Sequence, residues 1–301
     1  MPSTTSQKTL GGIIAAVPTP FTADGSQVDV DNIHAQVERL VKAGIHGVVT
    51  TGTTGEFPAL TPDEHKLVVK TYVEAAQGRI PVVAGVGANS TRAAIDFVQH
   101  AQSVGAAAVM VVPPFYDPLD FDSLVAFYKD VTASIDIPLM YYNLPHATGV
   151  HLKADEIRTL GSIKGLDYLK DTSGNAKEQV DLLTNPPADV TVFNGWDTLT
   201  FSSMALGAKG GVWGVASIVP EEAAEFWETF AVKGDLVKAR EQWKFLWAVS
   251  SFLESVNYAA GIKAGLDIVG FPAGPTRAPT QGLGSKDIER FRQILAQRKH
   301  K

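Results

Sequence analysis

A single lysine follows an otherwise apolar run, and its surroundings indicate covalent chemistry. Lys170 comes directly after residues 166–169, of which Leu166, Tyr168 and Leu169 are apolar. Burying an ammonium ion among such residues is costly, and burial favours the neutral amine, which attacks carbonyl carbons. Lys170 is therefore a candidate Schiff-base nucleophile. The alternatives are a lysine whose amine reaches solvent and a lysine paired with Asp171.

Hydroxyl groups follow other apolar runs and offer proton transfer. Tyr142 ends one run, Thr53 lies in GTTGE (52–56) after another, and Tyr116 ends PPFY. A phenol can move protons when a second hydroxyl lies near it. The glycines of GTTGE also permit close approach to backbone N–H groups, which suit a carboxylate. Taken alone, Tyr142 is more often a core residue and GTTGE a tight turn between a strand and a helix.

These segments are positioned by short β-branched runs that recur along the chain. The eight runs begin near Ile13, Gly47, Pro81, Ala107, Pro138, Gly165, Val190 and Gly210. The intervals leave room for helices, and Thr-Pro-Asp-Glu at 61–64 has the pattern of a helix start. Buried strands alternating with helices predict a parallel (β/α)8 TIM barrel, whose active site lies at the C-terminal ends of the strands. A doubly wound sheet of eight strands is the alternative.

We expect three sections along the chain. These are a flexible N-terminus at 1–10, the barrel at 11–232 and an appended C-terminal helical region at 233–301. The later helices are predicted at Pro220–Val232, Asp235–Tyr258 and Ser285–Gln297. Earlier helices are predicted to open at 89–91 and at Asp122, because Asn, Ser and Asp favour helix N-termini.

Composition narrows the class of protein. The 301 residues are 45% hydrophobic, contain no cysteine and carry a formal net charge of −6. The lack of cysteine removes disulfides and thiolate sites, and an acidic chain disfavours nucleic-acid binding. The polar N-terminus lacks a signal-peptide core and no apolar run has the length of a membrane span, so we expect a cytoplasmic protein. His146 and His151 are five residues apart near Asp155, a spacing that disfavours a metal site.

Three motifs occur together in one order. They are GTTGE at 52–56, YNLPHATG at 142–149 and LKDTSGN at 169–175, preceded by PTPF at 18–21. In this arrangement the chain resembles the dihydrodipicolinate synthase and N-acetylneuraminate lyase family over roughly residues 10 to 230. The resemblance implies a class I aldolase or lyase that acts on pyruvate and an aldehyde. It also implies a homotetramer, a dimer of dimers, with no metal and no organic cofactor.

The resemblance also implies roles for individual residues. The Schiff-base lysine of the family corresponds to Lys170, its proton-relaying tyrosine to Tyr142 and its relay hydroxyl to Thr53. The backbone that binds the substrate carboxylate corresponds to Thr53 and Thr54. Tyr116 corresponds to a tyrosine that, in the synthase branch, reaches across a subunit interface.

Departures from the family pattern bear on the substrate. Ala147 stands where the synthase branch has an arginine for the carboxylate of aspartate semialdehyde, and a methyl group cannot replace that cation. Asp197 matches the sialic-acid branch, but Thr198 replaces the glutamate that follows it there. Trp196 and Trp213 are expected to crowd the same rim.

The remaining predicted substrate-binding residues are Thr172 and Val215. Thr172 matches a hydroxyl used by sialic-acid lyases and 2-keto-3-deoxy sugar acid aldolases, and Val215 follows the last predicted strand. The favoured reaction is retro-aldol cleavage of a 2-keto-3-deoxy sugar acid to pyruvate and an aldehyde, or its reverse. The enzymatic alternatives are N-acetylneuraminate lyase, 4-hydroxy-tetrahydrodipicolinate synthase, a related sugar acid dehydratase and a metal-dependent barrel hydrolase. The alternative outside the enzymes is a pyruvate-binding sensor.

Overall fold

Eight parallel strands form a closed barrel at the centre of the computed structural model, which describes residues 9–298. The strands follow one another around the barrel in chain order, and β8 pairs with β1. They are Gly12–Ala16 (β1), Gly47–Thr50 (β2), Val82–Val86 (β3), Ala108–Val111 (β4), Leu139–Asn143 (β5), Leu166–Asp171 (β6), Thr191–Asn194 (β7) and Gly210–Trp213 (β8). Each begins within one residue of its predicted start. The TIM-barrel prediction is confirmed and the doubly wound alternative is wrong; of the predicted N-terminal section, residues 1–8 lie outside the described residues.

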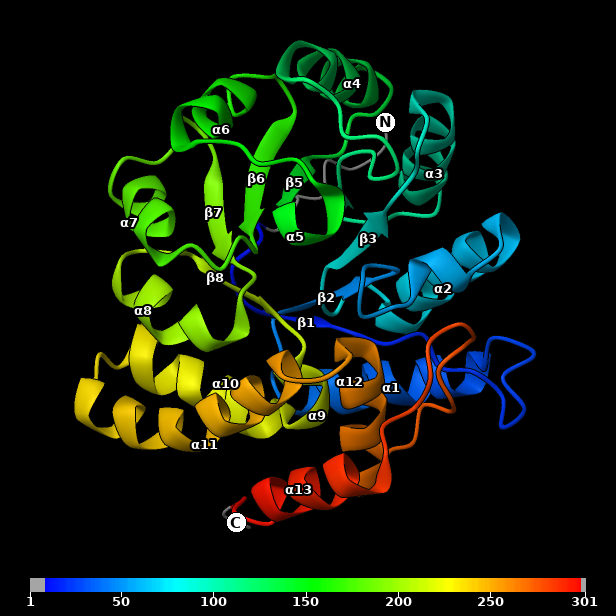
Figure 1. Cartoon of the computed structure of the whole chain (residues 1–301), viewed down its shortest axis with the longest axis vertical. Coiled ribbons are helices and arrows are strands. Elements are labelled where there is room, and N and C mark those ends of the chain that lie inside the picture. Colours follow the sequence, from blue (N-terminus) through cyan, green and yellow to red (C-terminus); the bar gives the residue numbers. More distant parts are fainter. Residues whose placement is uncertain (1–8, 299–301) are drawn as a thin grey trace.

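Helices connect the strands and surround the barrel (Figure 1). Those between β1 and β8 are Val30–Lys42 (α1), Pro62–Ala76 (α2), Thr91–Ser103 (α3), Phe121–Ala133 (α4), Pro145–Thr148 (α5), Ala154–Leu160 (α6), Ala176–Thr184 (α7) and Thr200–Ala205 (α8). Thr61 and Glu64 form the predicted capping box of α2, and Ser90 caps α3. The helix predicted to open at Asp122 begins one residue earlier, at Phe121, and the side chain of Asp120 caps it.

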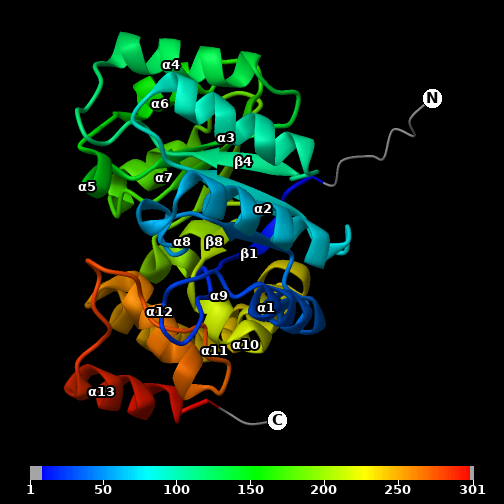
Figure 2. The ribbon, with the colours of Figure 1, turned by 90° about the vertical axis from the view of Figure 1, so that its right-hand side faces the viewer.

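The chain continues beyond β8 as further helices on one side of the barrel (Figures 1 and 2). They are Val215–Ile218 (α9), Pro220–Trp227 (α10) with a π-helical extension Glu228–Val232, Leu236–Glu254 (α11), Tyr258–Ile268 (α12) and Ser285–Leu295 (α13). The prediction of one helix from Asp235 to Tyr258 is wrong. The α11 helix ends at Glu254, and Asn257 caps α12 by accepting a hydrogen bond from the N–H of Ala260.

Apolar side chains form one cluster inside the barrel and two outside it. The inner cluster includes Ile14, Met140 and Phe193, which alternate with outward-facing neighbours along their strands. One outer cluster joins the barrel to the C-terminal helices, where the rings of Phe252 and Phe291 stack 4.2 Å apart. This packing holds the corner between α11 and α12 beside the strand ends. No helix within residues 9–298 is long and apolar enough to cross a membrane.

Candidate active site

A cavity of about 300 Å³ opens at the C-terminal ends of the barrel strands. Strand ends supply one wall, and the corner between α11 and α12 supplies another. The lining residues are Ala16, Thr53, Thr54, Tyr142, Leu144, His146, Lys170, Thr172, Gly195, Trp196, Asp197, Val212, Gly214, Leu253, Glu254, Val256 and Tyr258. In a TIM barrel this end of the strands is where catalytic side chains gather.

The alternation of side chains along β6 directs Lys170 into the cavity. Tyr168 belongs to the inner cluster and Leu169 to an outer one, so Lys170 faces inward again. Its side chain is only 5% exposed and forms no ion pair with a described residue. Asp171 faces outward, where it accepts hydrogen bonds from Asn143 Nδ2 at 2.8 Å and from the N–H of Ser173 at 3.1 Å. Both alternatives considered for the lysine, a solvent-exposed amine and a pair with Asp171, are therefore wrong.

Tyr142 and Thr53 lie beside this lysine. The neighbouring strand β5 places Tyr142 in register with Lys170, whose Nζ lies 4.0 Å from the centre of the tyrosine ring. The Oη of Tyr142 is 3.4 Å from the Oγ1 of Thr53. An amine, a phenol and a hydroxyl are thereby brought together, as carbonyl chemistry with proton relay requires.

The loop after β2 lines the cavity and contains unpaired backbone N–H groups. Within residues 9–298, the N–H groups of Thr53 and Thr54 donate no hydrogen bond. Thr51 adopts a positive φ of 50°, and its Oγ1 donates to the carbonyl of Gly85 at 2.8 Å. A Cβ at Gly55 would lie 2.8 Å from the N of Thr51, so this turn requires glycine there. Two neighbouring free donors in a fixed turn form a suitable seat for a carboxylate.

A buried carboxyl group also lines the cavity. Asp197, after β7, is 4% exposed and accepts a hydrogen bond of 2.6 Å from the Oη of Tyr258, the first residue of α12. Burial raises the pKa of Asp197 to about 8, although the bond from Tyr258 opposes that rise. The Tyr258 hydroxyl also accepts from the N–H of Gly214 at 3.2 Å. Burial and the nearby Asp197 raise the pKa of Tyr258 well above its ordinary value, so it acts here as a hydrogen-bond donor.

A second carboxyl group reaches the mouth of the cavity from α11. Glu254 accepts hydrogen bonds from the N–H and the Oγ1 of Thr198, at 2.8 and 2.9 Å. Partial burial raises the pKa of Glu254, and its charge contributes to the raised pKa of Asp197. The lining of the cavity is therefore rich in carboxyl and hydroxyl groups.

Thr172 adds a free hydroxyl to the lining of the cavity. Its Oγ1 is buried and has no hydrogen-bond partner among the described residues. Gly195 approaches the same place so closely that an added Cβ would overlap this oxygen and lie 2.6 Å from Cε of Lys170. The space beside the lysine therefore depends on the absence of a side chain at position 195.

The relatives of the chain agree with this arrangement. A model of the dihydrodipicolinate synthetase family matches residues 9–298. The chain belongs to this family. It is 38% identical to an uncharacterized DapA-like lyase of Halobacterium salinarum, covering 95% of this chain and 93% of the relative. It is 34% identical to a 4-hydroxy-tetrahydrodipicolinate synthase of Methanocaldococcus jannaschii, covering 94% of this chain and 97% of the relative.

Solved structures show the same likeness. The dihydrodipicolinate synthase of Acinetobacter baumannii, solved with pyruvate, superposes with a TM-score of 0.89 at 31% identity, covering 95% of this chain and 97% of that one. The prophage protein YagE of Escherichia coli K12, also solved with pyruvate, superposes with a TM-score of 0.90 at 27% identity. The match covers 96% of this chain and 98% of YagE. Members of the family are class I lyases that use pyruvate and an aldehyde. The predictions of an enzyme and of its class are confirmed.

Some predicted site residues of this family member lie away from the cavity. Tyr116 is 87% exposed in the single chain. Ala147 is exposed on α5, and the preceding His146 lines the cavity instead. Val215 is fully buried at the start of α9, where Gly214 is the lining residue. Trp213 does not crowd the rim as expected, because it faces outward into an aromatic cluster 5.9 Å from the ring of Trp243.

The sequence prediction missed every lining residue of the C-terminal region. These residues are Leu253, Glu254, Val256 and Tyr258. The break between α11 and α12 contains neither glycine nor proline, which are the usual signs of a helix end. The available signal was Asn257, because asparagine is a favoured N-cap.

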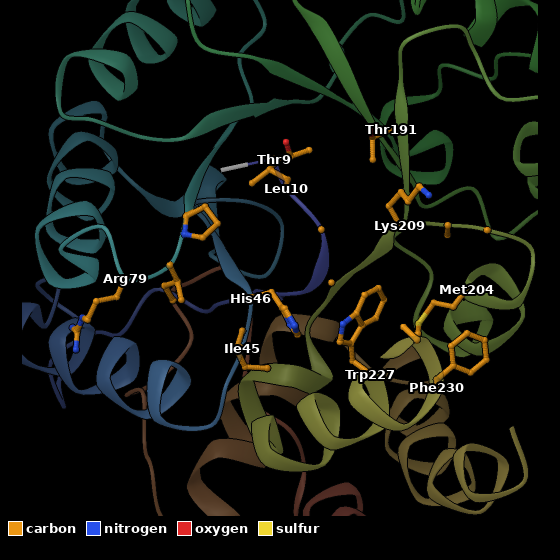
Figure 3. A pocket seen from close by; sticks show the side chains of 17 residues that line it. Thr9, Leu10, Ile45, His46, Arg79, Thr191, Met204, Lys209, Trp227 and Phe230 are labelled. Atoms are coloured by element: carbon orange, nitrogen blue, oxygen red, sulfur yellow. The ribbon is translucent and has the colours of Figure 1, made fainter. Parts of the chain in front are cut away.

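A second, larger hollow of about 900 Å³ lies at the other end of the barrel (Figure 3). It is lined by residues before or at the starts of strands, among them Leu10, His46 and Lys209, and by Trp227 and Phe230 of the helical side. His46 accepts a hydrogen bond from the N–H of Ile13 at 3.2 Å and contacts the ring of Trp227. No carboxyl group lines this hollow within the described chain, whereas the cavity around Lys170 brings an amine, a phenol, hydroxyls and carboxyl groups together.

Proposed function

We propose that this chain cleaves a 2-keto-3-deoxy sugar acid to pyruvate and an aldehyde, or runs the reverse reaction, through a Schiff base on Lys170. The observation that carries the proposal is one buried amine, without an ion pair among the described residues, in a cavity that carboxyl and hydroxyl groups also line. Lys170 is the only lysine or arginine among the described lining residues. Its Nζ lies over the ring of Tyr142, whose hydroxyl is next to that of Thr53.

The proposed steps begin with attack of the Lys170 amine on the keto carbon. Tyr142 then protonates the departing hydroxyl, and loss of water gives an iminium ion and leaves Tyr142 as the base for the next step. The N–H groups of Thr53 and Thr54 hold the substrate carboxylate. Tyr142 removes the proton from the C4 hydroxyl, and the C3–C4 bond breaks. Its electron pair moves to the iminium, which leaves an enamine of pyruvate and a free aldehyde. Protonation of the enamine and hydrolysis then release pyruvate and restore the amine.

The carboxyl and hydroxyl groups that line the cavity support a hydroxyl-rich aldehyde. Asp197, Glu254 and the free hydroxyl of Thr172 offer hydrogen-bond partners for substrate hydroxyls. A second substrate carboxylate would meet no cation there, because burial lowers the pKa of His146 and favours its neutral form. Losing a charge-assisted partner costs about 2–5 kcal/mol. That corresponds to roughly 30-fold to several thousandfold in catalytic efficiency.

The second candidate is 4-hydroxy-tetrahydrodipicolinate synthase, because several relatives carry that name. The deciding experiment compares kcat/KM for cleavage of 2-keto-3-deoxy sugar acids with kcat/KM for condensation of pyruvate and aspartate semialdehyde. We expect the sugar acid reaction to be faster. A semialdehyde reaction faster by tenfold or more would show that another group supplies the cation and that the substrate assignment is wrong. Assaying N-acetylneuraminate cleavage and sugar acid dehydration with the same enzyme separates the remaining alternatives.

A further inference from the structure

A buried ion pair lies behind the loop that carries Thr53 and Thr54. Oε1 of Glu56 is 2.7 Å from Nζ of Lys263, and each side chain is only 5% exposed. The next most buried ion pair of the described chain has side chains that are 14% and 22% exposed. Two charges removed from water are costly unless their geometry and hydrogen bonds compensate. The contacts of Glu56 and Lys263 show what this buried pair holds in place.

Glu56 holds the end of the loop. Its backbone has a positive φ of 54°, unusual for a residue with a side chain, and its N–H donates to the carbonyl of Thr53 at 3.1 Å. Its second carboxylate oxygen accepts from the N–H of Arg277 at 2.9 Å. The carbonyl of the preceding Gly55 accepts from the Oγ1 of Thr19 at 2.7 Å. The conformation of Thr53 and Thr54 thus depends on what fixes Glu56.

Lys263 is itself fixed by the C-terminal region. It lies on α12, its Nζ donates to the carbonyl of Pro275 at 2.7 Å, and it sits 4.1 Å from the centre of the Phe21 ring. The guanidinium of Arg277 lies 4.0 Å from the same ring and pairs with Glu64 on α2. The PTPF segment, the GTTGE loop and the C-terminal region therefore meet at one buried cluster.

We propose that Lys263 is a positioning residue for 2-oxo acid binding. Through Glu56, it sets the direction of the Thr53 and Thr54 N–H groups that receive the substrate carboxylate. Lys263 does not line the cavity, so it acts without touching substrate. The inference rests on the proposed carboxylate seat and is independent of which aldehyde the enzyme uses.

The test measures how borohydride trapping of pyruvate on Lys170 depends on pyruvate concentration. In Lys263→Met, we expect the half-saturating pyruvate concentration to rise by about 10- to 100-fold, because a small displacement of binding groups has effects of that order. Labelling at saturating pyruvate should still reach the wild-type extent. Lys263→Arg should restore most of the affinity, because it keeps the cation.

Two further variants separate positioning from stability. The double variant Glu56→Gln/Lys263→Met removes the unpaired buried charge, so it should fold and still bind pyruvate weakly. Arg298→Met is the control, since Arg298 pairs with Glu221 and Glu222 at another place, and its half-saturation should match the wild type. Wild-type labelling at Lys170 tests the proposed function first. Once that label is established, the half-saturating pyruvate concentration decides the positioning role. A wild-type value in the double variant, or in a folded Lys263→Met variant, overturns that role and leaves the proposed function intact.

Discussion

The hydroxyl of Tyr142 lies 3.4 Å from that of Thr53, although the two residues are 89 positions apart and belong to different strand ends. Tyr142 also lies beside Lys170 on the adjacent strand, so its ring contacts the amine while its hydroxyl contacts the relay partner. One side chain can therefore receive a proton near the reacting carbon and pass it toward the loop. Tyr142 and Thr53 therefore connect the lysine to the loop after β2 in the proposed proton path.

Covalent trapping tests the nucleophile. Pyruvate with borohydride should label Lys170 and no other lysine, because its amine is buried in the cavity and forms no ion pair with a described residue. Peptide mapping gives the position, and Lys170→Ala should abolish both label and turnover. A label on Lys164 or Lys177, or normal turnover in the alanine variant, contradicts the mechanism.

Removing the phenol of Tyr142 tests the relay. Tyr142→Phe keeps the packing of the ring, so we expect normal folding and a turnover lower by about 10² to 10⁴, the usual contribution of a general acid or base. The matched control is Tyr141→Phe, because Tyr141 precedes it on the same strand but faces the outer core. Equal activity in the two variants would show that the proton follows another path.

Glu254 is expected to contribute to recognition of the aldehyde portion. Glu254→Ala should lower kcat/KM for a sugar acid by roughly 10- to 100-fold, since hydrogen bonds to charged groups contribute about 1.5–3 kcal/mol. Pyruvate trapping should be unchanged, because the proposed carboxylate seat lies on another wall. Glu241→Ala is the control on the same helix, where Glu241 pairs with Lys244 at the surface. A parallel loss of pyruvate trapping in Glu254→Ala would contradict this division.

Asp197 makes stability depend on pH. Its pKa is raised to about 8 in the folded chain, compared with about 4 for an unfolded aspartate. Its stabilising contribution is therefore fully present below about pH 4 and is lost as the pH rises toward about 8, because the unfolded state releases the proton first. As the pH rises across this range, the free energy of unfolding of Asp197→Asn should increase relative to that of the wild type. Urea denaturation from pH 5 to 9 measures it, and parallel curves for the two proteins would refute the shift.

The exposure of Tyr116 bears on assembly. A tyrosine that is 87% exposed on one chain is suited to a contact with a second copy, and the family resemblance implies a tetramer. We expect a solution mass of about four chains by light scattering, and lower activity in Tyr116→Ala. Full activity of a monomeric species would show that neither the tetramer nor Tyr116 is needed.

The barrel and the strand-end residues could be predicted from local signals. Apolar runs gave the strand starts, and alternation along β6 explains why Lys170 faces the cavity while Asp171 does not. The lining residues of the C-terminal helices could not be predicted in this way. Tyr258 reaches Asp197 from 61 positions away, and only the packing of α11 and α12 against the barrel brings them together. The Glu56–Lys263 pair depends on the same long-range packing.

The residues proposed for reactivity and those proposed for aldehyde selectivity come from different parts of the chain, because the corner between α11 and α12 supplies only the latter. The reactive amine and the phenol come from strands of the rigid barrel, whereas Leu253, Glu254, Val256 and Tyr258 come from the helices after it. Selectivity for the aldehyde can therefore change by substitution at this corner while the catalytic strands stay intact. For protein engineering, residues 253–258 form a short, contiguous library, and variants that alter aldehyde preference can be selected there without rebuilding the nucleophile.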